Sequence, residues 1–202
     1  MTGTDTCGII ILAAGNSSRF GSPKQLLQYK NKSLVQLVAD EAIRTVSKSV
    51  IVVTGGNKTL IETDLKDKEI QIVYNPDWQE GMASSISCGL KDLVKSFPQL
   101  ENVIITVCDQ PYISSDLFKD LIKKKSSSRK NIIASAYKNT FGVPVLFDKR
   151  YFNDLLGLKG QSGAKKLLKN FADDVDSVIF KKGDIDIDTV RDYENLLAQG
   201  RV

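Results

Sequence analysis

The chain changes abruptly from apolar to small, polar residues close to its start. Ile9–Leu12 is a run of four apolar residues, three of them β-branched, and such a run predicts a buried β-strand. The loop that follows contains Gly15 and Gly21, which enclose an asparagine, two serines and Arg19. Glycine tolerates unusual backbone angles and close approach, so this loop can lay backbone N–H groups along a phosphate chain. The sequence therefore predicts a polyphosphate site directly after a buried strand.

Two cations in the same stretch agree with a phosphate site. Arg19 and Lys24 supply the positive charge that a polyphosphate requires. The alternative is an ordinary strand-to-helix turn, which needs neither two cations nor two glycines. The stretch lacks the Gly-Lys-Ser/Thr ending of a Walker A loop, and it contains no G-x-G-x-x-G dinucleotide fingerprint. Both of these phosphate sites are therefore excluded here.

Apolar runs recur along the chain, and amphipathic segments separate them. The predicted strands are Ile9–Leu12, Val50–Val53, Ile70–Tyr74, Val103–Val107 and Ile132–Ala136, with later candidates at Val143–Phe147 and Val178–Phe180. The predicted helices are a segment from the capping box of Ser33 and Gln36 to about Val46, then Leu60–Leu65, Met82–Val94 and Asp116–Lys124. Strands that alternate with helices indicate an α/β fold with a mainly parallel sheet. No linker or internal repeat divides the chain, so we expect one domain over residues 1–202.

Histidine is absent from all 202 residues. This excludes zinc sites that rely on histidine, Ser-His-Asp triads and imidazole bases. Catalysis by this chain must therefore use carboxylates, lysine, arginine, hydroxyls, backbone groups and a hard metal ion. The three cysteines, Cys7, Cys88 and Cys108, form no C-x-x-C pair, and we interpret them as reduced thiols.

The N-terminal residues and the charge are those expected of a cytoplasmic protein. Residues 1–8 lack the basic and apolar regions of a signal peptide, and no stretch approaches the length of a membrane span. The formal net charge is +4, and the most basic run is Lys123–Lys125. We interpret this run as the solvated end of a helix, where lysine complements the helix dipole. No aromatic residues interleave with it, so neither nucleic acid nor a membrane is an expected partner.

Ligands of an open α/β sheet bind outside the carboxyl ends of its strands. This rule places three segments at one edge: the glycine-rich loop after Leu12, the Asn75–Gly81 loop and Asp109. Asp109 comes after the buried strand Val103–Val107. A carboxylate there is costly unless it is paired or bound to a cation, and Mg²⁺ with nucleotide phosphates is a natural partner. The alternative is a turn aspartate before Pro111.

Residues 75–85 lie between a predicted strand and a predicted helix. Gly81, together with the hydroxyls of Ser84 and Ser85 at the helix start, can meet a base or a sugar through hydrogen bonds. The alternative is a plain helix start in which Trp78 covers the core.

Acidic and apolar residues alternate near the C-terminus. Asp184, Asp186 and Asp188 are separated by isoleucines, so all three carboxylates would lie on one face of a strand. Like charges this close together favour a bound cation. The alternative is a solvated strand end that leads into a helix, with Thr189 as the N-cap and Asp192 in the first turn.

The stretch from Leu12 to Lys24 resembles the signature loop of the nucleotidyltransferases, L-A-(A/G)-G-x-S-x-R-(M/F)-G-x-x-K. The matching residues are Leu12, Ala13, Ala14, Gly15, Ser17, Arg19, Phe20, Gly21 and Lys24. Later motifs are similar to the branch of the family that contains the molybdenum cofactor cytidylyltransferases. These motifs are N-P-x-(W/Y)-x-x-G-(M/L)-x-x-S at residues 75–85, D-Q-P at 109–111 and, with valine for proline, D-I-D-T-P-x-D at 186–192.

The resemblance implies a fold and a division of the chain. Members of this family resemble the nucleotide-diphospho-sugar transferases, which have a Rossmann-like three-layer α/β/α fold with a mainly parallel sheet. By the same resemblance, we expect an NTP-binding half at about residues 1–110 and an acceptor-binding half at about residues 111–202.

The resemblance also implies an activity: Mg²⁺-dependent transfer of CMP from CTP to the molybdopterin-type molybdenum cofactor, with release of pyrophosphate. The implied catalytic residues are Lys24, Arg19 and Asp109, and the implied metal ligands are Asp109 with Asp188 or Asp186. The implied nucleotide-binding residues are Leu12, Ala13, Ala14, Gly15, Asn16, Ser17, Ser18, Arg19, Gly21, Lys24, Gly81, Ser84 and Ser85. A molybdoenzyme or a cofactor chaperone is implied as a transient protein partner.

Two motifs of the acceptor half depart from this branch. Gly142–Phe147 resembles G-H-P-x-L-F, but Val143 stands where histidine is usual. Gly160–Lys165 resembles G-D-x-G-A-R, but it has Gln161 for aspartate and Lys165 for arginine. Both departures leave the identity of the acceptor open.

Alternatives also remain for the nucleotide that is used and for the class of function. Ala14 favours CTP, because guanylyl-transferring relatives more often carry glycine at that position. The alternatives are guanylyl transfer to the same cofactor, cytidylyl transfer to another small phosphate, and a nucleotide-binding regulatory protein without turnover. Loss of Lys24 or Asp109 would indicate the regulatory protein, and both residues are present.

Overall fold

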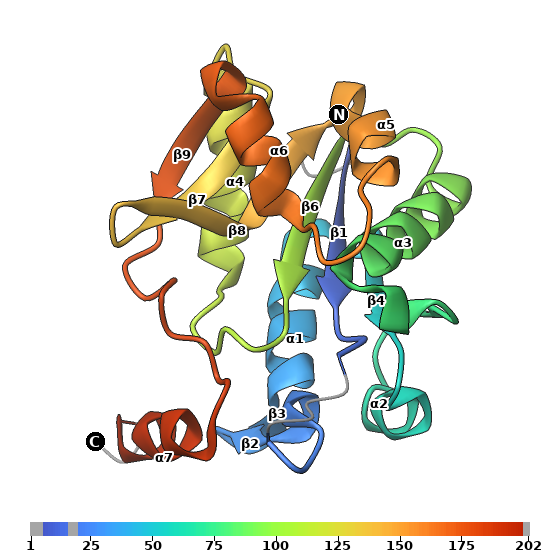
Figure 1. The fold of residues 1–202 in the computed structure, drawn as a ribbon, viewed down its shortest axis with the longest axis vertical. Coiled ribbons are helices and arrows are strands. Elements are labelled where there is room, and N and C mark those ends of the chain that lie inside the picture. The colour runs from blue at the N-terminus through green and yellow to red at the C-terminus, as the bar shows by residue number, and fades with distance from the viewer. Residues whose placement is uncertain (1–5, 16–19, 200–202) are drawn as a thin grey trace.

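The structure is a computed structural model that describes residues 6–15 and 20–199. Its centre is a seven-stranded β-sheet (Figure 1). From one edge to the other, the strands are β5 (Gln71–Tyr74), β4 (Val50–Thr54), β1 (Cys7–Leu12), β6 (Asn102–Val107), β8 (Thr140–Asp148), β7 (Ile132–Tyr137) and β9 (Val175–Ile179). β8 runs antiparallel to both of its neighbours, and the other adjacent strands are parallel. The predicted α/β fold with a mainly parallel sheet is therefore confirmed.

Helices cover both faces of the sheet, so the fold has three layers (Figure 1). One face carries α1 (Leu34–Val46) and α4 (Ser115–Ser127), and the other carries α3 (Met82–Ser96), α5 (Phe152–Leu156) and α6 (Ala164–Asn170). The remaining helices are α2 (Lys58–Asp64), which joins the core under α1, and α7 (Val190–Gln199) near the C-terminus.

The central strand β1 shows why an unbroken apolar run folds in this way. Ile9 and Ile11 belong to the core under α1 and α4, whereas Ile10 and Leu12 belong to the core under α3. Successive side chains of a strand point to opposite faces, so a strand that is covered on both faces must be apolar throughout.

Each predicted strand and helix overlaps an observed one, with bounds that differ by a few residues. The capping box is confirmed, because the Ser33 hydroxyl accepts a hydrogen bond from the Gln36 N–H at 3.1 Å and the Gln36 side chain accepts one from the Ser33 N–H at 3.3 Å. The hairpin of β2 (Gln28–Tyr29) and β3 (Lys32–Ser33) and the short helix α5 were not predicted. Such short segments do not show a periodic pattern.

The basic run Lys123–Lys125 lies near the end of α4, as predicted. Lys124 pairs with Asp176 and Lys125 pairs with Asp148, each at 3.1 Å. These ion pairs place two of the three charges against the sheet rather than on an open basic surface. Cys7, Cys88 and Cys108 are all free thiols, as expected. Among the described residues, no helix has the length and apolar character needed to cross a membrane.

The order of the strands creates a topological switch point between β1 and β6. The chain runs from β1 through α1 to β4 on one side, and it later returns from β5 through α3 to β6 on the other side. Leu12 at the end of β1 is the register partner of Val107 at the end of β6. Ligands of open α/β sheets bind in the crevice at such a point.

The last helix, α7, packs away from the sheet and beside the β2–β3 hairpin (Figure 1). Tyr29, Leu34, Ile187 and Leu196 form a small buried cluster there. The Tyr193 hydroxyl donates a hydrogen bond to the Gln28 carbonyl oxygen at 2.8 Å. This cluster fixes the C-terminal segment next to the part of the chain that follows the glycine-rich loop.

Candidate active site

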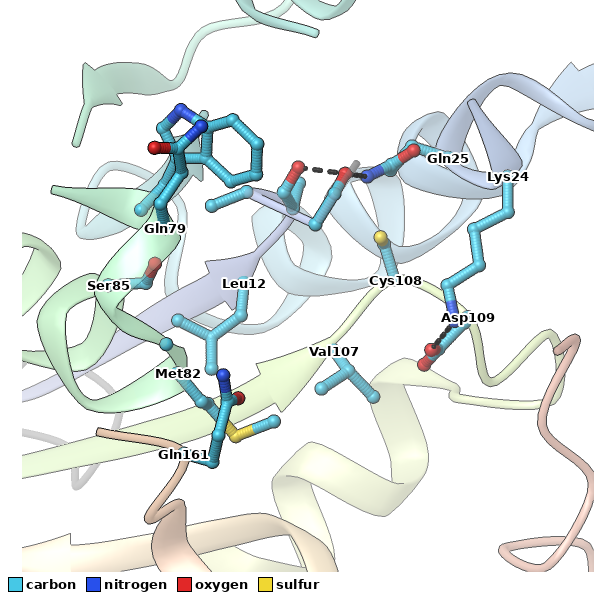
Figure 2. Close-up of a pocket in the computed structure, with 15 residues that line it drawn as sticks. Leu12, Lys24, Gln25, Gln79, Met82, Ser85, Val107, Cys108, Asp109 and Gln161 are labelled. Atoms are coloured by element: carbon cyan, nitrogen blue, oxygen red, sulfur yellow. Dashed lines mark hydrogen bonds and ion pairs between the residues drawn. The ribbon is translucent and has the colours of Figure 1, made fainter. Parts of the chain in front are cut away.

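A cavity of about 500 Å³ opens at the switch point (Figure 2). Its walls come from the carboxyl ends of β1 and β6, the loop after β1, the start of α3 and the turn before α6. The volume lies within the range of small-molecule sites. Parts of the three segments expected at one sheet edge do meet in this cavity: residues 13–15 of the glycine-rich loop, then Trp78, Gln79 and Gly81, and Asp109.

The two ends of the cavity carry different side chains. Lys24 and Asp109 lie at one end, and Gln79, Ser85 and Gln161 lie at the other (Figure 2). Apolar side chains separate the two ends. We call these the charged end and the uncharged end.

Lys24 is the centre of the charged end. Its ammonium lies 2.5 Å from an Asp109 carboxylate oxygen and 2.8 Å from an Asp188 carboxylate oxygen. Desolvation alone would lower the pKa of Lys24, but the charges and hydrogen bonds of Asp109 and Asp188 outweigh it and raise the pKa above its usual value. The lysine is therefore a firmly protonated cation, held between residues from distant parts of the chain.

The C-terminal segment reaches this site through backbone and amide contacts. The Ile187 N–H donates to the Asp109 carbonyl oxygen at 2.9 Å, and the Ile187 side chain is fully buried. The buried Gln110 amide donates to the Gly183 carbonyl oxygen at 2.8 Å. The Asp-Gln-Pro motif therefore anchors residues 183–188 and delivers Asp188 to Lys24.

The prediction that Asp184, Asp186 and Asp188 share one face of a strand is wrong. Residues 184–188 contain no strand, because they cross from β9 to the α7 cluster with a single backbone hydrogen bond to Asp109 instead of a ladder. Asp184 turns away and pairs with Lys138 at 2.6 Å. The prediction that Thr189 precedes a helix is confirmed, because its N–H and hydroxyl bond the Asp192 carboxylate in the first turn of α7.

Asp186 completes a group of acidic residues beside Lys24. Desolvation raises its pKa, the charge of Asp109 raises it further and that of Asp188 adds to this, while Gln110 and Lys24 act in the opposite direction. Within the described ranges, no cage of three or more acidic, cysteine or histidine side chains forms around a metal position. Mg²⁺ needs only one or two protein carboxylates. The carboxylates of Asp109 and Asp188 already hold one cationic group, the Lys24 ammonium, between them. The donor set therefore suits a hard divalent cation.

The uncharged end depends on close backbone packing. Gly81 has a φ of 116°, and a side chain there would begin only 2.5 Å from the Gly160 carbonyl oxygen. The same carbonyl accepts a hydrogen bond from the Ala83 N–H at 3.1 Å. The start of α3 and the turn that carries Gln161 are therefore fixed against each other.

Tyr137 on β7 lies close enough to Asp186 and Asp184 for their charges to act on it. Its ring occupies space that a side chain at Gly142 or Gly183 would fill. Desolvation and the charges of Asp186 and Asp184 raise the pKa of Tyr137, and a hydrogen bond with Gln110 opposes them. The sequence reasoning missed this residue, because only the glycines opposite it indicate its place.

A family model described as a MobA-like NTP transferase domain matches residues 9–176. The match includes β1, the loop after it, the start of α3 and Asp109. The chain belongs to this family. Asp188 and α7 lie beyond the matched residues.

Several curated proteins are similar to this MobA-like transferase. Purine catabolism protein PucB of Bacillus subtilis is 27% identical over 92% of this chain and 93% of its own length. Molybdenum cofactor cytidylyltransferase of Escherichia coli is 28% identical over 69% of each chain. Nicotine blue oxidoreductase of Paenarthrobacter nicotinovorans is 26% identical over 93% of this chain and 95% of its own length. Curated proteins with similar levels of identity to this chain therefore have names that indicate different functions.

A solved structure extends the similarity to the whole fold. The crystal structure of Rv0371c from Mycobacterium tuberculosis superposes with a TM-score of 0.84 at 26% identity, over 96% of this chain and 97% of that chain. A second crystal structure, of Rv0371C in complex with manganese, superposes with a TM-score of 0.79 at 24% identity, over 96% of this chain and 98% of that chain.

The structure of this MobA-like transferase brings most predicted site residues together. Those that line the cavity are Leu12, Ala13, Ala14, Gly15, Lys24, Gly81, Ser85 and Asp109. Asn16, Ser17, Ser18 and Arg19 lie outside the described residues. Gly21 has a φ of 77° and does not line the cavity. Ser84 also lies outside it, because its hydroxyl bonds the carbonyl oxygens of Asp77 and Gly81.

Other residues of the cavity were missed as site residues. They are Gln25, Trp78, Gln79, Met82, Val107, Cys108 and Gln161. Val107 and Cys108 directly precede Asp109 at the end of β6, so the rule about strand ends already indicated them. Gln79 lies in the 3₁₀-helix Trp78–Glu80 inside the segment that the sequence had singled out. No pattern in the sequence indicated that Gln25 would line the cavity.

Proposed function

We propose that this MobA-like transferase moves CMP from CTP to a phosphate-bearing acceptor of the molybdenum-cofactor type and releases pyrophosphate. The observation that carries the proposal is a cavity with two unlike ends at the switch point. A base fits the uncharged end, and a triphosphate fits the charged end. The reaction joins an acceptor phosphate oxygen to the α-phosphorus and breaks the bond to the pyrophosphate group.

The absence of histidine is compatible with this reaction. An ionised acceptor phosphate is already a nucleophile, so the enzyme needs no general base. Catalysis then consists of positioning and of neutralising charge. Lys24 and Arg19 would neutralise charge at the α-phosphate and at the departing pyrophosphate.

Asp109 and Asp188, with Asp186 beside them, would hold Mg²⁺. A bound Mg²⁺ would supply charge neutralisation at the phosphates. The support is the pair of carboxylates that already holds the Lys24 ammonium. A crystal structure of Rv0371C, a protein of similar fold, is a complex with manganese.

We also propose that one domain contains an NTP-binding half up to about residue 110 and an acceptor-binding half after it. The cavity supports this division, since its nucleotide walls come from β1, the start of α3 and the end of β6. Gln161 comes from the second half and also lines the uncharged end, so the two halves meet at the proposed base site. Tyr137, also from the second half, approaches the acidic group.

The experiment is a pyrophosphate-release assay with each of the four NTPs and Mg²⁺, with and without molybdenum cofactor. We expect release with CTP only when the cofactor is present, and none after chelation of the metal. Preference for GTP would replace cytidylyl by guanylyl transfer, and release with a different small phosphate would change the acceptor. Nucleotide binding without turnover on any acceptor would instead favour a regulatory protein.

A further inference from the structure

We propose that Gln25 is a positioning residue that fixes the peptide between Ala13 and Ala14, and with it the direction of the Ala14 N–H, at the start of the glycine-rich loop. Gln25 is only 1% exposed. Its amide nitrogen donates hydrogen bonds to the Ala13 carbonyl oxygen at 3.1 Å and to the Gly15 carbonyl oxygen at 2.5 Å (Figure 2). The role rests on the proposed function in one respect: the bound group is the polyphosphate of a nucleotide.

A hydrogen bond to a carbonyl oxygen also fixes the direction of the N–H in the same peptide unit. In a trans peptide, the carbonyl oxygen and the N–H of the next residue point in opposite directions. Because the Ala13 carbonyl points to Gln25, the Ala14 N–H points away from Gln25. Ala14 and Gly15 both line the cavity, so an N–H turned in this way can serve a phosphate oxygen.

Glycine makes such a clamp necessary. A loop that contains Gly15 has access to many backbone conformations, and rotation of one peptide unit would exchange an N–H for a carbonyl oxygen at the phosphate. A carbonyl oxygen would repel the phosphate. The Asn57 amide also donates to the Gly15 carbonyl oxygen, but at 3.5 Å this bond is long. Gln25 therefore holds the Gly15 carbonyl oxygen more firmly than Asn57 does.

One short element aims both Lys24 and Gln25. The two residues belong to the 3₁₀-helix Lys24–Leu26, which is closed by a hydrogen bond from the Leu26 N–H to the Pro23 carbonyl oxygen at 3.0 Å. Neighbouring side chains of such a turn point in different directions. Lys24 thus contacts the carboxylates of Asp109 and Asp188, while Gln25 contacts the glycine-rich loop. One turn therefore positions both the cation and the start of this loop.

The test removes the two donors and keeps the volume, in the variant Gln25→Met. The probe is inorganic tripolyphosphate with Mg²⁺, and its affinity is measured by calorimetry well below the melting temperature. We expect about tenfold weaker binding, which corresponds to the net loss of two hydrogen bonds. The matched control is Gln36→Met, which removes an amide that donates to the Asp64 carbonyl oxygen at 2.8 Å, outside the cavity. This control is expected to lower the melting temperature and to leave the affinity unchanged.

A second variant separates hydrogen-bond donation from packing. In Gln25→Glu, a protonated carboxyl can donate one hydrogen bond to the loop, and an ionised carboxylate can donate none. Relative to wild type at the same pH, its affinity for tripolyphosphate is expected to fall several-fold as the pH rises from 5.5 to 8.5. The deficit of Gln25→Met relative to wild type is expected to stay constant over this range.

The outcomes distinguish this role from the proposed function. Wild-type affinity in folded Gln25→Met, or a pH-independent deficit in Gln25→Glu, contradicts the role of Gln25 and leaves nucleotidyl transfer standing. A wild-type protein that binds neither tripolyphosphate nor CTP contradicts both the proposed function and the role of Gln25.

Discussion

The charged and uncharged ends of the cavity are held together by different forces. At the charged end, Lys24 meets Asp109 and Asp188 through ion pairs between residues far apart in the sequence. Lys24 and Asp109 retain 20% exposure of their side chains, and Asp188 retains 61%. At the uncharged end, Gly81 and Gly160 meet through backbone contacts that leave no space for a side chain.

The difference corresponds to two tasks. Ion pairs with an exposed partner contribute little to stability, since water and salt screen them, so the charged end can exchange the contact of Lys24 with the exposed Asp188 for contacts with a bound ligand. Close backbone packing resists displacement, so the uncharged end can keep a fixed shape for a base. Substitutions at the charged end are therefore expected to reduce the rate, and those at the uncharged end to alter binding or selectivity.

The largest effect is expected for Asp109→Asn. The amide preserves the shape but removes the charge that would hold Mg²⁺, so turnover is expected to fall by at least about 10³-fold. The melting temperature should change little, because the backbone bond from Ile187 remains. Asp184→Asn is the control, since Asp184 pairs with Lys138 and not with Lys24. Normal turnover and normal Mg²⁺ affinity in Asp109→Asn would contradict the metal role.

The next largest effect is expected for Lys24→Met, which keeps most of the side-chain length and removes the ammonium. Loss of one preorganised charge contact to a transition state lowers kcat about 10²–10³-fold. Steady-state kinetics measure this loss, and thermal melting checks the fold. Lys68→Met, which removes an ammonium from Asp40 instead, serves as the control. If Lys24→Met turned over nearly as fast as wild type, Lys24 would have no part in the reaction.

A smaller effect is expected for Gly81→Ala at the uncharged end. The new methyl group would begin 2.5 Å from the Gly160 carbonyl oxygen, and the φ of 116° suits only glycine. The start of α3 must then shift, and KM for CTP is expected to rise about tenfold with a smaller change in kcat. Gly160→Ala is the matched control, because it also has a positive φ but open space beside it. Equal changes in both variants would show that backbone strain, and not the contact, is responsible.

The smallest effect is expected for Ala14→Gly. Removal of one methyl group from the cavity wall should admit a purine more easily and change the ratio of kcat/KM for CTP and GTP by about 10-fold or less. Turnover with CTP should persist. Kinetics with both nucleotides, in wild type and variant, measure the ratio. A wild-type preference for GTP would overturn cytidylyl transfer while leaving nucleotidyl transfer in place.

The fold was predictable because its strands are buried on both faces. Ile9–Leu12 is an unbroken apolar run, and Val103–Val107 is apolar except for the buried Thr106, a composition typical of strands that are covered on both faces. The site residues next to these strands, such as Asp109, were predictable from the rule about strand ends. Ser84 could have been separated from Ser85, because neighbouring residues of a helix point about 100° apart and only one can face the cavity.

Other parts of the site depend on contacts that leave no pattern in the sequence. Asp188 meets Lys24 because its neighbour Ile187 is buried in the α7 cluster. The sequence pattern does not show this, because the same alternation of acidic and apolar residues is also typical of a strand. The bonds from Gln25 to the Ala13 and Gly15 carbonyl oxygens join a side chain to a backbone, so they have no partner residue type to recognise. The place of Tyr137 depends on the glycines opposite it.

The contact between Gly81 and Gly160 has a consequence for changing the specificity of the protein by mutation. Gly81 is the N-cap of α3, at the end of the cavity proposed for the base, whereas Gly160 belongs to the turn that carries Gln161. A change that reshapes this turn for a new acceptor must also move the start of α3, because the two backbones touch. If the proposed function is right, we expect acceptor and nucleotide preference to change together, so a library that randomises residues 159–163 should be screened with more than one NTP.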